Sequence, residues 1–179
     1  MSTPWGHADF IEKIAEGLYL VGTASGGGYK LLAKTNAAIP RALRSGAGWY
    51  KEDAKASIVV LAFPDVFGDE RVSIALRSVK DRFPDEYTKS YSIAVAVAES
   101  RVLRDRQFAE STRERFVVKS ILGDWHEAVP DGYVGAWAVR PSDGTKRAFL
   151  VPTTEYEARG ATQFVVDTTA HRIWECAPA

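Results

Sequence analysis

The stretch from residue 116 to residue 167 constrains the fold most. Short runs of β-branched and aromatic residues alternate there with clusters of Gly, Pro and Asp. This alternation is typical of consecutive antiparallel strands joined by tight turns. It therefore predicts an antiparallel β meander in the C-terminal part of the chain. The expected strands are 116–122, 133–139, 147–151 and 163–166, with 172–176 as a last one.

Local signals refine this meander. The run 133–139 is apolar on both faces, which favours a central position in the sheet. Residues 141–144 read Pro-Ser-Asp-Gly and predict a hairpin turn. Thr153 is expected to be the N-cap of a short helix over 154–159, and Gly160 to follow its C-terminus.

The first 34 residues favour a smaller set of strands. Apolar runs at 10–14 and 18–21 flank Ala15, Glu16 and Gly17, which predicts a hairpin. Three glycines, 26–28, precede a third expected strand at 29–32 and are interpreted as a flexible turn. Together these runs predict a small N-terminal meander.

Helical signals dominate residues 35–115. The clearest is the amphipathic pattern at 69–83, which begins with acidic residues and is followed by Pro84. The fold class is therefore α+β: an antiparallel β meander and a small N-terminal β hairpin region, with a central block of three to four helices. The expected helices are 36–44, 49–63, 69–83 and a long one from 84 to about 114.

Length and composition bound the class of protein. A chain of 179 residues fits a single α+β domain, with N-terminal strands at 1–34, a helical block at 35–115 and the meander at 116–179. Its 23 basic and 23 acidic residues cancel, which disfavours a protein that tracks a phosphate backbone. The single cysteine, Cys176, is expected to be structural and indicates a cytoplasmic protein.

No membrane partner and no leader are expected. The first ten residues lack the basic flank and apolar core of a signal peptide. The longest apolar run, 93–98, is far shorter than the roughly 20 residues that span a bilayer.

One loop carries residue types that could perform chemistry. His126 lies beside Asp124 and Glu127, and such a group could act as acid and base in a small hydrolase or transferase, or hold a metal ion. The plainer interpretation is that these residues cap the loop and form local hydrogen bonds. The glycines at 26–28 match no phosphate-binding motif. We therefore expect no cofactor and no metal.

Two further sets of residues could bind a macromolecule. Large aromatic side chains anchor protein interfaces, so Trp5 and Trp125 would mark an interaction patch if they are exposed together. The region 99–115 alternates arginines with carboxylates, which is typical of a solvated helix with local ion pairs. The alternative is an arginine-rich face for nucleic acid. Its arginines are Arg101, Arg104, Arg106, Arg113 and Arg115.

Several motifs resemble a known family. They are TPWG at 3–6, TASGGGYKL at 23–31, GWYKED at 48–53, LAFP at 61–64, GDWHEAVPDGYVG at 123–135, FLVPTTEYEARG at 149–160 and FVVD at 164–167. In these motifs the chain resembles an uncharacterised bacterial family, a domain of unknown function found on chromosomes, plasmids and phages. The resemblance implies no activity, fold or catalytic residue. Relatives tend to carry His at the position of Gly26 and Cys at that of Ala54, so a pair formed by those two residues would be lost here.

These observations leave three hypotheses. The first is a non-enzymatic protein-binding module, a mobile-element or phage accessory protein that inhibits a host defence complex of the CRISPR type. Its partner would be a host or phage protein complex, and Trp5, Trp125, Arg101, Arg104 and Arg106 are the expected contact residues. The second is the enzyme that uses His126. The third, less favoured, is a nucleic-acid-binding protein that uses the arginines of 99–115.

Overall fold

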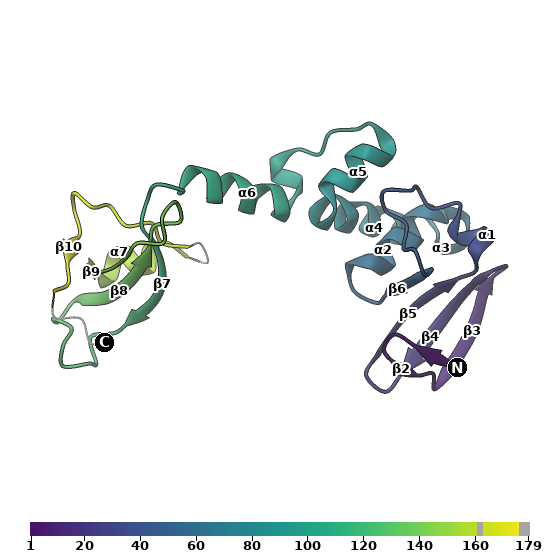
Figure 1. Ribbon diagram of the computed structural model, residues 1–179, viewed down its shortest axis with the longest axis horizontal. Coiled ribbons are helices and arrows are strands. Elements are labelled where there is room, and N and C mark those ends of the chain that lie inside the picture. The colour runs from purple at the N-terminus through teal and green to yellow at the C-terminus, as the bar shows by residue number, and fades with distance from the viewer. Residues whose placement is uncertain (161–162, 176–179) are drawn as a thin grey trace. The chain divides into compact units, whose positions relative to one another are not determined.

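The computed structural model describes residues 1–160 and 163–175. Its contacts divide the chain into two compact units, residues 1–105 and 106–179, each with its own sheet (Figure 1). The boundary falls inside α6 (Arg101–Ser111). Helices and antiparallel sheets confirm the expected α+β class. The prediction of one domain over 1–179 stays a prediction, and Cys176 lies outside the described residues.

The first unit is built on a four-stranded antiparallel sheet in the order β3-β4-β5-β6. The predicted hairpin at 15–17 is confirmed, because β3 ends at Ala15 and β4 begins at Leu18. Gly17 has φ +71° in this turn, a conformation that favours glycine. The strands are β1 (Ser2–Thr3), β2 (Gly6–His7), β3 (Phe10–Ala15), β4 (Leu18–Thr23), β5 (Gly26–Leu31) and β6 (Trp49–Lys51).

Helices α2 and α4 supply the rest of this unit's core. Buried Val59 of α2 and Val79 of α4 pack in one cluster with Leu18 and Leu31 of the sheet. The amphipathic helix expected at 69–83 is confirmed as α4. The helices are α1 (Ala33–Asn36), α2 (Ala54–Ala62), α3 (Pro64–Phe67), α4 (Asp69–Arg82), α5 (Pro84–Tyr91) and the 3-10 turn η1 (Val97–Glu99).

Two expectations for the start of the helical block are wrong. In place of the helix expected at 36–44, the short helix α1 ends at Asn36. The Asn36 side chain donates a hydrogen bond to the Ser45 carbonyl. The helix expected at 49–63 begins only at Ala54, because 49–51 form β6 and pair with β5. Asp53 caps this helix by accepting the Lys55 N–H.

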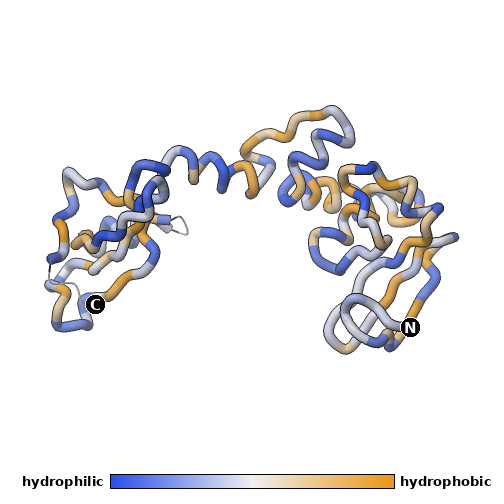
Figure 2. Tube along the Cα trace, viewed as in Figure 1, coloured by the Kyte–Doolittle hydropathy of each residue, from blue (hydrophilic) through white to orange (hydrophobic). Residues whose placement is uncertain are grey.

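The long helix expected from 84 to about 114 is also wrong. Ser92 takes a left-handed conformation with φ 56°, which ends α5 at Tyr91. The hydrophobic run that follows forms a loop before η1. It is the orange stretch of Figure 2 at the place between α5 and α6 of Figure 1, and its Ile93 is exposed. Helix α6 begins only after Ser100, whose hydroxyl accepts the Leu103 N–H as an N-cap does.

The three glycines 26–28 do not form the flexible turn that the sequence predicted. They begin β5 and pair with β4 on one side, while Gly28 also pairs with Lys51 of β6. A Cβ at Gly28 would overlap the Tyr50 carbonyl oxygen and the Trp5 ring. The absence of a side chain here lets β6 and an indole approach the strand closely.

The second unit contains the predicted meander as a sheet in the order β10-β9-β8-β7. The expected central strand is confirmed, since β8 pairs with both β7 and β9. Phe116, Phe149 and Val151 form the buried core of this sheet together with residues from β8. The elements are β7 (Val117–Leu122), β8 (Tyr133–Val139), β9 (Lys146–Pro152), α7 (Thr153–Ala158) and β10 (Arg172–Ile173).

Two details of the meander differ from the expectation. The strand expected at 163–166 is reduced to one bridge, Val117 with Val165, beside two backbone hydrogen bonds. Thr153 is the first residue of α7 and not its N-cap, which is Pro152. The Thr153 hydroxyl is buried and has no hydrogen-bond partner among the described residues. Gly160 does follow the helix, with φ +62°.

Candidate functional site

Four of the five tryptophans pack in two pairs inside their own units. Trp5 and Trp49 meet edge to face with ring centroids 5.5 Å apart, and Trp137 and Trp174 lie 5.1 Å apart. A strand glycine makes room for one indole of each pair: Gly28 for Trp5 and Gly135 for Trp174. These four side chains therefore have a packing role.

The fifth, Trp125, is placed differently. Its residue is 78% exposed, the largest exposure among the large hydrophobic residues of the described chain. The indole lies against Gly123, where an added Cβ would fall 2.6 Å from Nε1. The His126 ring meets it edge on, with centroids 5.9 Å apart. The indole thus has a defined position on the protein but is little buried.

Backbone hydrogen bonds order the loop that carries Trp125. The His126 N–H donates to the Gly123 carbonyl, and the Val129 N–H to the His126 carbonyl. The Ala128 N–H donates to Nδ1 of His126, at 3.2 Å. Val129 is 4% exposed and anchors the loop to the unit. The tip between β7 and β8 is therefore a shaped turn.

The structure gives His126 the local hydrogen-bonding role that was its plainer interpretation. Its Nδ1 is used by the Ala128 N–H, whereas Asp124 and Glu127 are exposed. Within the described residues, no hydrogen bond joins the three side chains, and no group of three or more His, Cys, Asp or Glu side chains could hold a metal ion. A catalytic role for His126, Asp124 and Glu127 stays a prediction.

Trp5 is half-buried, unlike Trp125, and its contacts indicate a structural role. Its indole packs on Trp49 and Gly28, and its carbonyl accepts the Ser25 hydroxyl at 2.6 Å. The TPWG motif thus fastens the start of the chain to the first sheet. A patch shared by Trp5 and Trp125 stays a prediction.

The arginines at the start of α6 are engaged with the first unit. The backbone N–H of Arg101 donates to the Asp81 carboxylate at 2.6 Å, and the Arg104 guanidinium donates to the Ala98 carbonyl at 2.6 Å. Arg104 also lies 3.7 Å from the Asp81 carboxylate. A hollow of about 550 Å³ beside them holds the Lys80–Glu99 ion pair. The carboxylate that Arg101 and Arg104 approach, Asp81, lies on α4 and not within residues 99–115, where local ion pairs were expected.

Two arginines of the same predicted set lie farther along the chain. Arg106 is exposed, and Arg113 lies 4.0 Å from the Glu114 carboxylate. The roles of Arg101, Arg104 and Arg106 in binding a partner or nucleic acid stay predictions.

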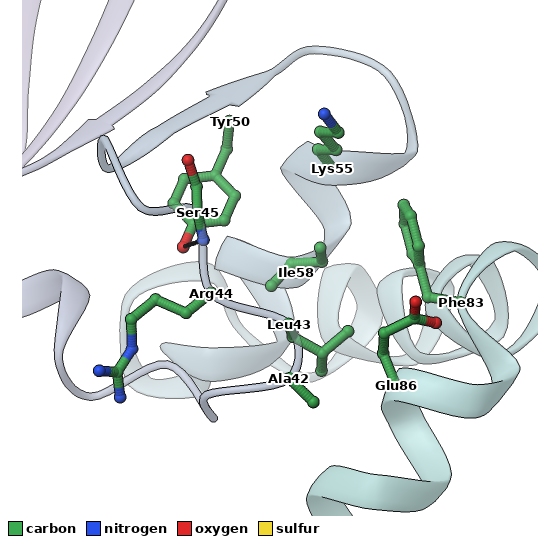
Figure 3. A pocket seen from close by; sticks show the side chains of 9 residues that line it. All are labelled: Ala42, Leu43, Arg44, Ser45, Tyr50, Lys55, Ile58, Phe83 and Glu86. Atoms are coloured by element: carbon green, nitrogen blue, oxygen red, sulfur yellow. Dashed lines mark hydrogen bonds between the residues drawn. The ribbon is translucent and has the colours of Figure 1, made fainter.

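A small pocket in the first unit was not foreseen from the sequence. It has a volume of about 220 Å³, and Figure 3 shows Tyr50, Ile58, Phe83 and Glu86 among its lining side chains. The Tyr50 hydroxyl donates to Asn36 Oδ1 at 2.7 Å and accepts the Ser45 N–H at 2.8 Å. Burial raises the pKa of Tyr50, so the phenol stays neutral and structural.

A second hollow, in the second unit, gathers three arginines. It measures about 300 Å³ and is lined by Arg115, Arg140 and Arg147 around Phe116. Only Arg115 belonged to the predicted arginine set. Arg140 and Arg147 lie at the ends of β8 and β9, and the pairing of Val139 with Lys146 brings them together.

Fold and sites define the class as an α+β protein with two sheet-bearing units, one of which displays an exposed tryptophan on an ordered loop. The chain belongs to the family described as a domain of unknown function (DUF7007), whose model matches residues 1–113. The motifs from TPWG to LAFP lie inside that match; those at 123–135, 149–160 and 164–167 lie beyond it.

Comparisons with known proteins add no activity. No curated protein and no solved structure matches the chain. Among the described residues, no helix combines the length and apolar character needed to cross a membrane. The family match ends shortly after the first unit, so it says nothing of the loop that carries Trp125.

Proposed function

We propose that this protein is a non-enzymatic protein-binding module and that Trp125 is the anchor of its interface. The observation that carries the proposal is the 78% exposure of this indole on a loop held by backbone hydrogen bonds. Tryptophan is the residue most enriched among side chains that dominate binding energy at protein interfaces. A pre-ordered loop also lowers the conformational entropy lost on binding.

A second hydrophobic residue near Trp125 in the sequence is also exposed: Ile121 of β7, at 42%. A flexible tip could fold its indole away from water, but Gly123 and the His126 ring hold this one at the surface. The partner proposed is a host or phage protein complex, and the effect proposed is inhibition of a host defence complex. The support for that finer part is the mobile-element association implied by the family resemblance.

The test compares capture of partners from a lysate of the bacterial host by the full chain and by Trp125→Ala. Loss of an interface anchor of this kind weakens binding by about thirtyfold or more. We expect the partner to be recovered in stoichiometric amount with the unaltered chain and to be lost with the variant, as measured by quantitative mass spectrometry. Trp125→Phe, which keeps an aromatic ring, should retain part of the binding.

The matched control is Ile93→Ala, which truncates another side chain that is 53% exposed but lies in the first unit. This variant should capture the partner as the unaltered chain does. Equal recovery by Trp125→Ala, with an unchanged thermal unfolding midpoint, would contradict the proposal. Capture of nucleic acid with steep salt dependence would favour the arginine hypothesis instead.

A further inference from the structure

The hollow formed by Arg115, Arg140 and Arg147 in the second unit is lined by three guanidinium groups and two carboxylates. Two guanidinium groups lie against one aromatic ring: the Cζ atoms of Arg140 and Arg147 are 5.3 and 5.5 Å from the Phe116 centroid. Phe116 is only 4% exposed, so the ring forms the floor of the hollow. Both guanidinium groups are thereby positioned by the same buried ring.

Hydrogen bonds satisfy only part of this set. Arg140 donates from Nε and Nη2 to the Asp143 carboxylate, at 3.1 and 2.6 Å, which leaves Nη1 unused. Within residues 1–160 and 163–175, the guanidinium groups of Arg115 and Arg147 have neither a hydrogen bond nor an ion pair. The hollow thus presents free N–H donors from three arginines.

The carboxylates that border the hollow have other partners. Asp167 accepts both the N–H and the hydroxyl of Thr169, at 2.8 and 2.7 Å. Glu114 accepts the Ser142 hydroxyl at 2.8 Å. They reduce the positive charge of the site, but the geometry does not direct either carboxylate to Arg115 or Arg147.

We propose that this hollow binds a tetrahedral oxyanion, a phosphate group that is either free or carried as a small-molecule phosphomonoester. The planar guanidinium fork matches phosphate oxygens in pairs, and charge-assisted hydrogen bonds are the strong ones. A volume of about 300 Å³ accommodates a phosphate with part of an attached group. This site is separate from the one built on Trp125 and does not depend on the proposed function.

The test titrates the full chain with inorganic phosphate and, separately, with adenosine monophosphate at low ionic strength. NMR detection of the arginine Nε–H signals follows the site directly. We expect saturable shifts at Arg115 and Arg147 in the millimolar range. Tighter binding of the monophosphate would identify a phosphomonoester, and equal binding the phosphate group alone.

Variants separate this site from general attraction of anions. Arg115→Ala removes an exposed side chain that has no hydrogen bond or ion pair among the described residues, so the fold should survive, and the affinity should fall about tenfold. Arg147→Lys keeps the charge but loses the fork, and it should weaken binding less. Lys119→Ala, which removes an equal charge from an exposed residue of β7 that does not line the hollow, should leave the affinity unchanged. The proposal is overturned if neither anion saturates, or if Lys119→Ala weakens binding as much as Arg115→Ala does.

Discussion

Both units pack a tryptophan on a strand glycine of their sheet, but they differ in the side chains that they expose. In each, a strand glycine accepts the ring of a tryptophan that packs on a second one: Gly28 with Trp5 and Trp49, and Gly135 with Trp174 and Trp137. In both units this arrangement packs the large apolar area of two indoles against a strand. Close packing of an indole on glycine is thus a structural solution that the chain uses twice.

The two units differ in how far their polar groups are paired with one another. The first encloses a network of Asn36, Tyr50 and Ser45, in which each group has a partner from the same unit. Among the described residues, the second unit leaves the guanidinium groups of Arg115 and Arg147 without a hydrogen bond or an ion pair, and it exposes Trp125 to water. Buried polar groups that satisfy one another specify a fold, whereas unpaired exposed groups on an ordered scaffold indicate a binding surface. Both proposals therefore fall in the second unit.

The largest effect should come from adding a methyl group at the two glycines. Gly28→Ala would place a Cβ against the Tyr50 carbonyl oxygen, which the backbone cannot easily move, and should lower the free energy of unfolding by about 3 kcal/mol. At Gly135 the atoms nearest to an added Cβ belong to the Trp174 side chain and not to the backbone, so the cost of Gly135→Ala should be smaller, about 2 kcal/mol. Urea unfolding measures both.

Hydrogen exchange then localises each effect. Gly28→Ala should lower protection within residues 1–105, and Gly135→Ala within residues 106–175, because each glycine–tryptophan contact belongs to one unit. Gly46→Ala is the control, since an added Cβ there meets no atom within 4 Å. A loss of protection spread evenly over both units after either change would contradict the inference that each glycine–tryptophan contact stabilises its own unit.

The next effect tests the enclosed network of the first unit. Tyr50→Phe removes the donor to Asn36 Oδ1 and the acceptor of the Ser45 N–H, so two part-buried groups lose a partner. The expected cost is about 2 kcal/mol in the free energy of unfolding. Tyr91→Phe, at a residue that is 37% exposed, serves as the matched control and should cost far less. Equal stability of Tyr50→Phe and the unaltered chain would show that the network is dispensable.

Much of the sheet structure could be predicted from the sequence, because its signals are local. The alternation in residues 116–167 located β7, β8 and β9 to within a residue of their ends. Strand β6 was missed because a run of three residues is too short to show a period, and its pairing with β5 is not local. The break at Ser92 was missed because a left-handed serine has no characteristic sequence pattern.

The candidate sites, too, were predictable only where their signal is local in the sequence. Trp125 was singled out from the sequence because large aromatic side chains anchor protein interfaces, and its residue is 78% exposed; its role in binding stays a prediction. The arginine hollow was not foreseen beyond Arg115. Arg140 and Arg147 are seven residues apart in the chain and meet over Phe116 only after β8 and β9 pair. The Asn36–Tyr50 contact likewise joins residues 14 positions apart.

The smallest expected effect concerns acid and the hairpin beside the arginine hollow. The Arg140 guanidinium, helped by the Thr145 N–H, holds the pKa of Asp143 well below its ordinary value of 3.8. A carboxyl group whose pKa is lower in the folded state stabilises the fold above its unfolded pKa, and this contribution is lost as the pH falls through the folded pKa. The unaltered chain should therefore melt at a slightly higher temperature than Asp143→Asn at pH 7, and the two melting curves should converge below about pH 4. Both groups are solvent-exposed, so the difference is small and should shrink in high salt. A gap between the two melting temperatures that widens as the pH is lowered would mean that the Asp143 carboxylate does not stabilise this hairpin through Arg140.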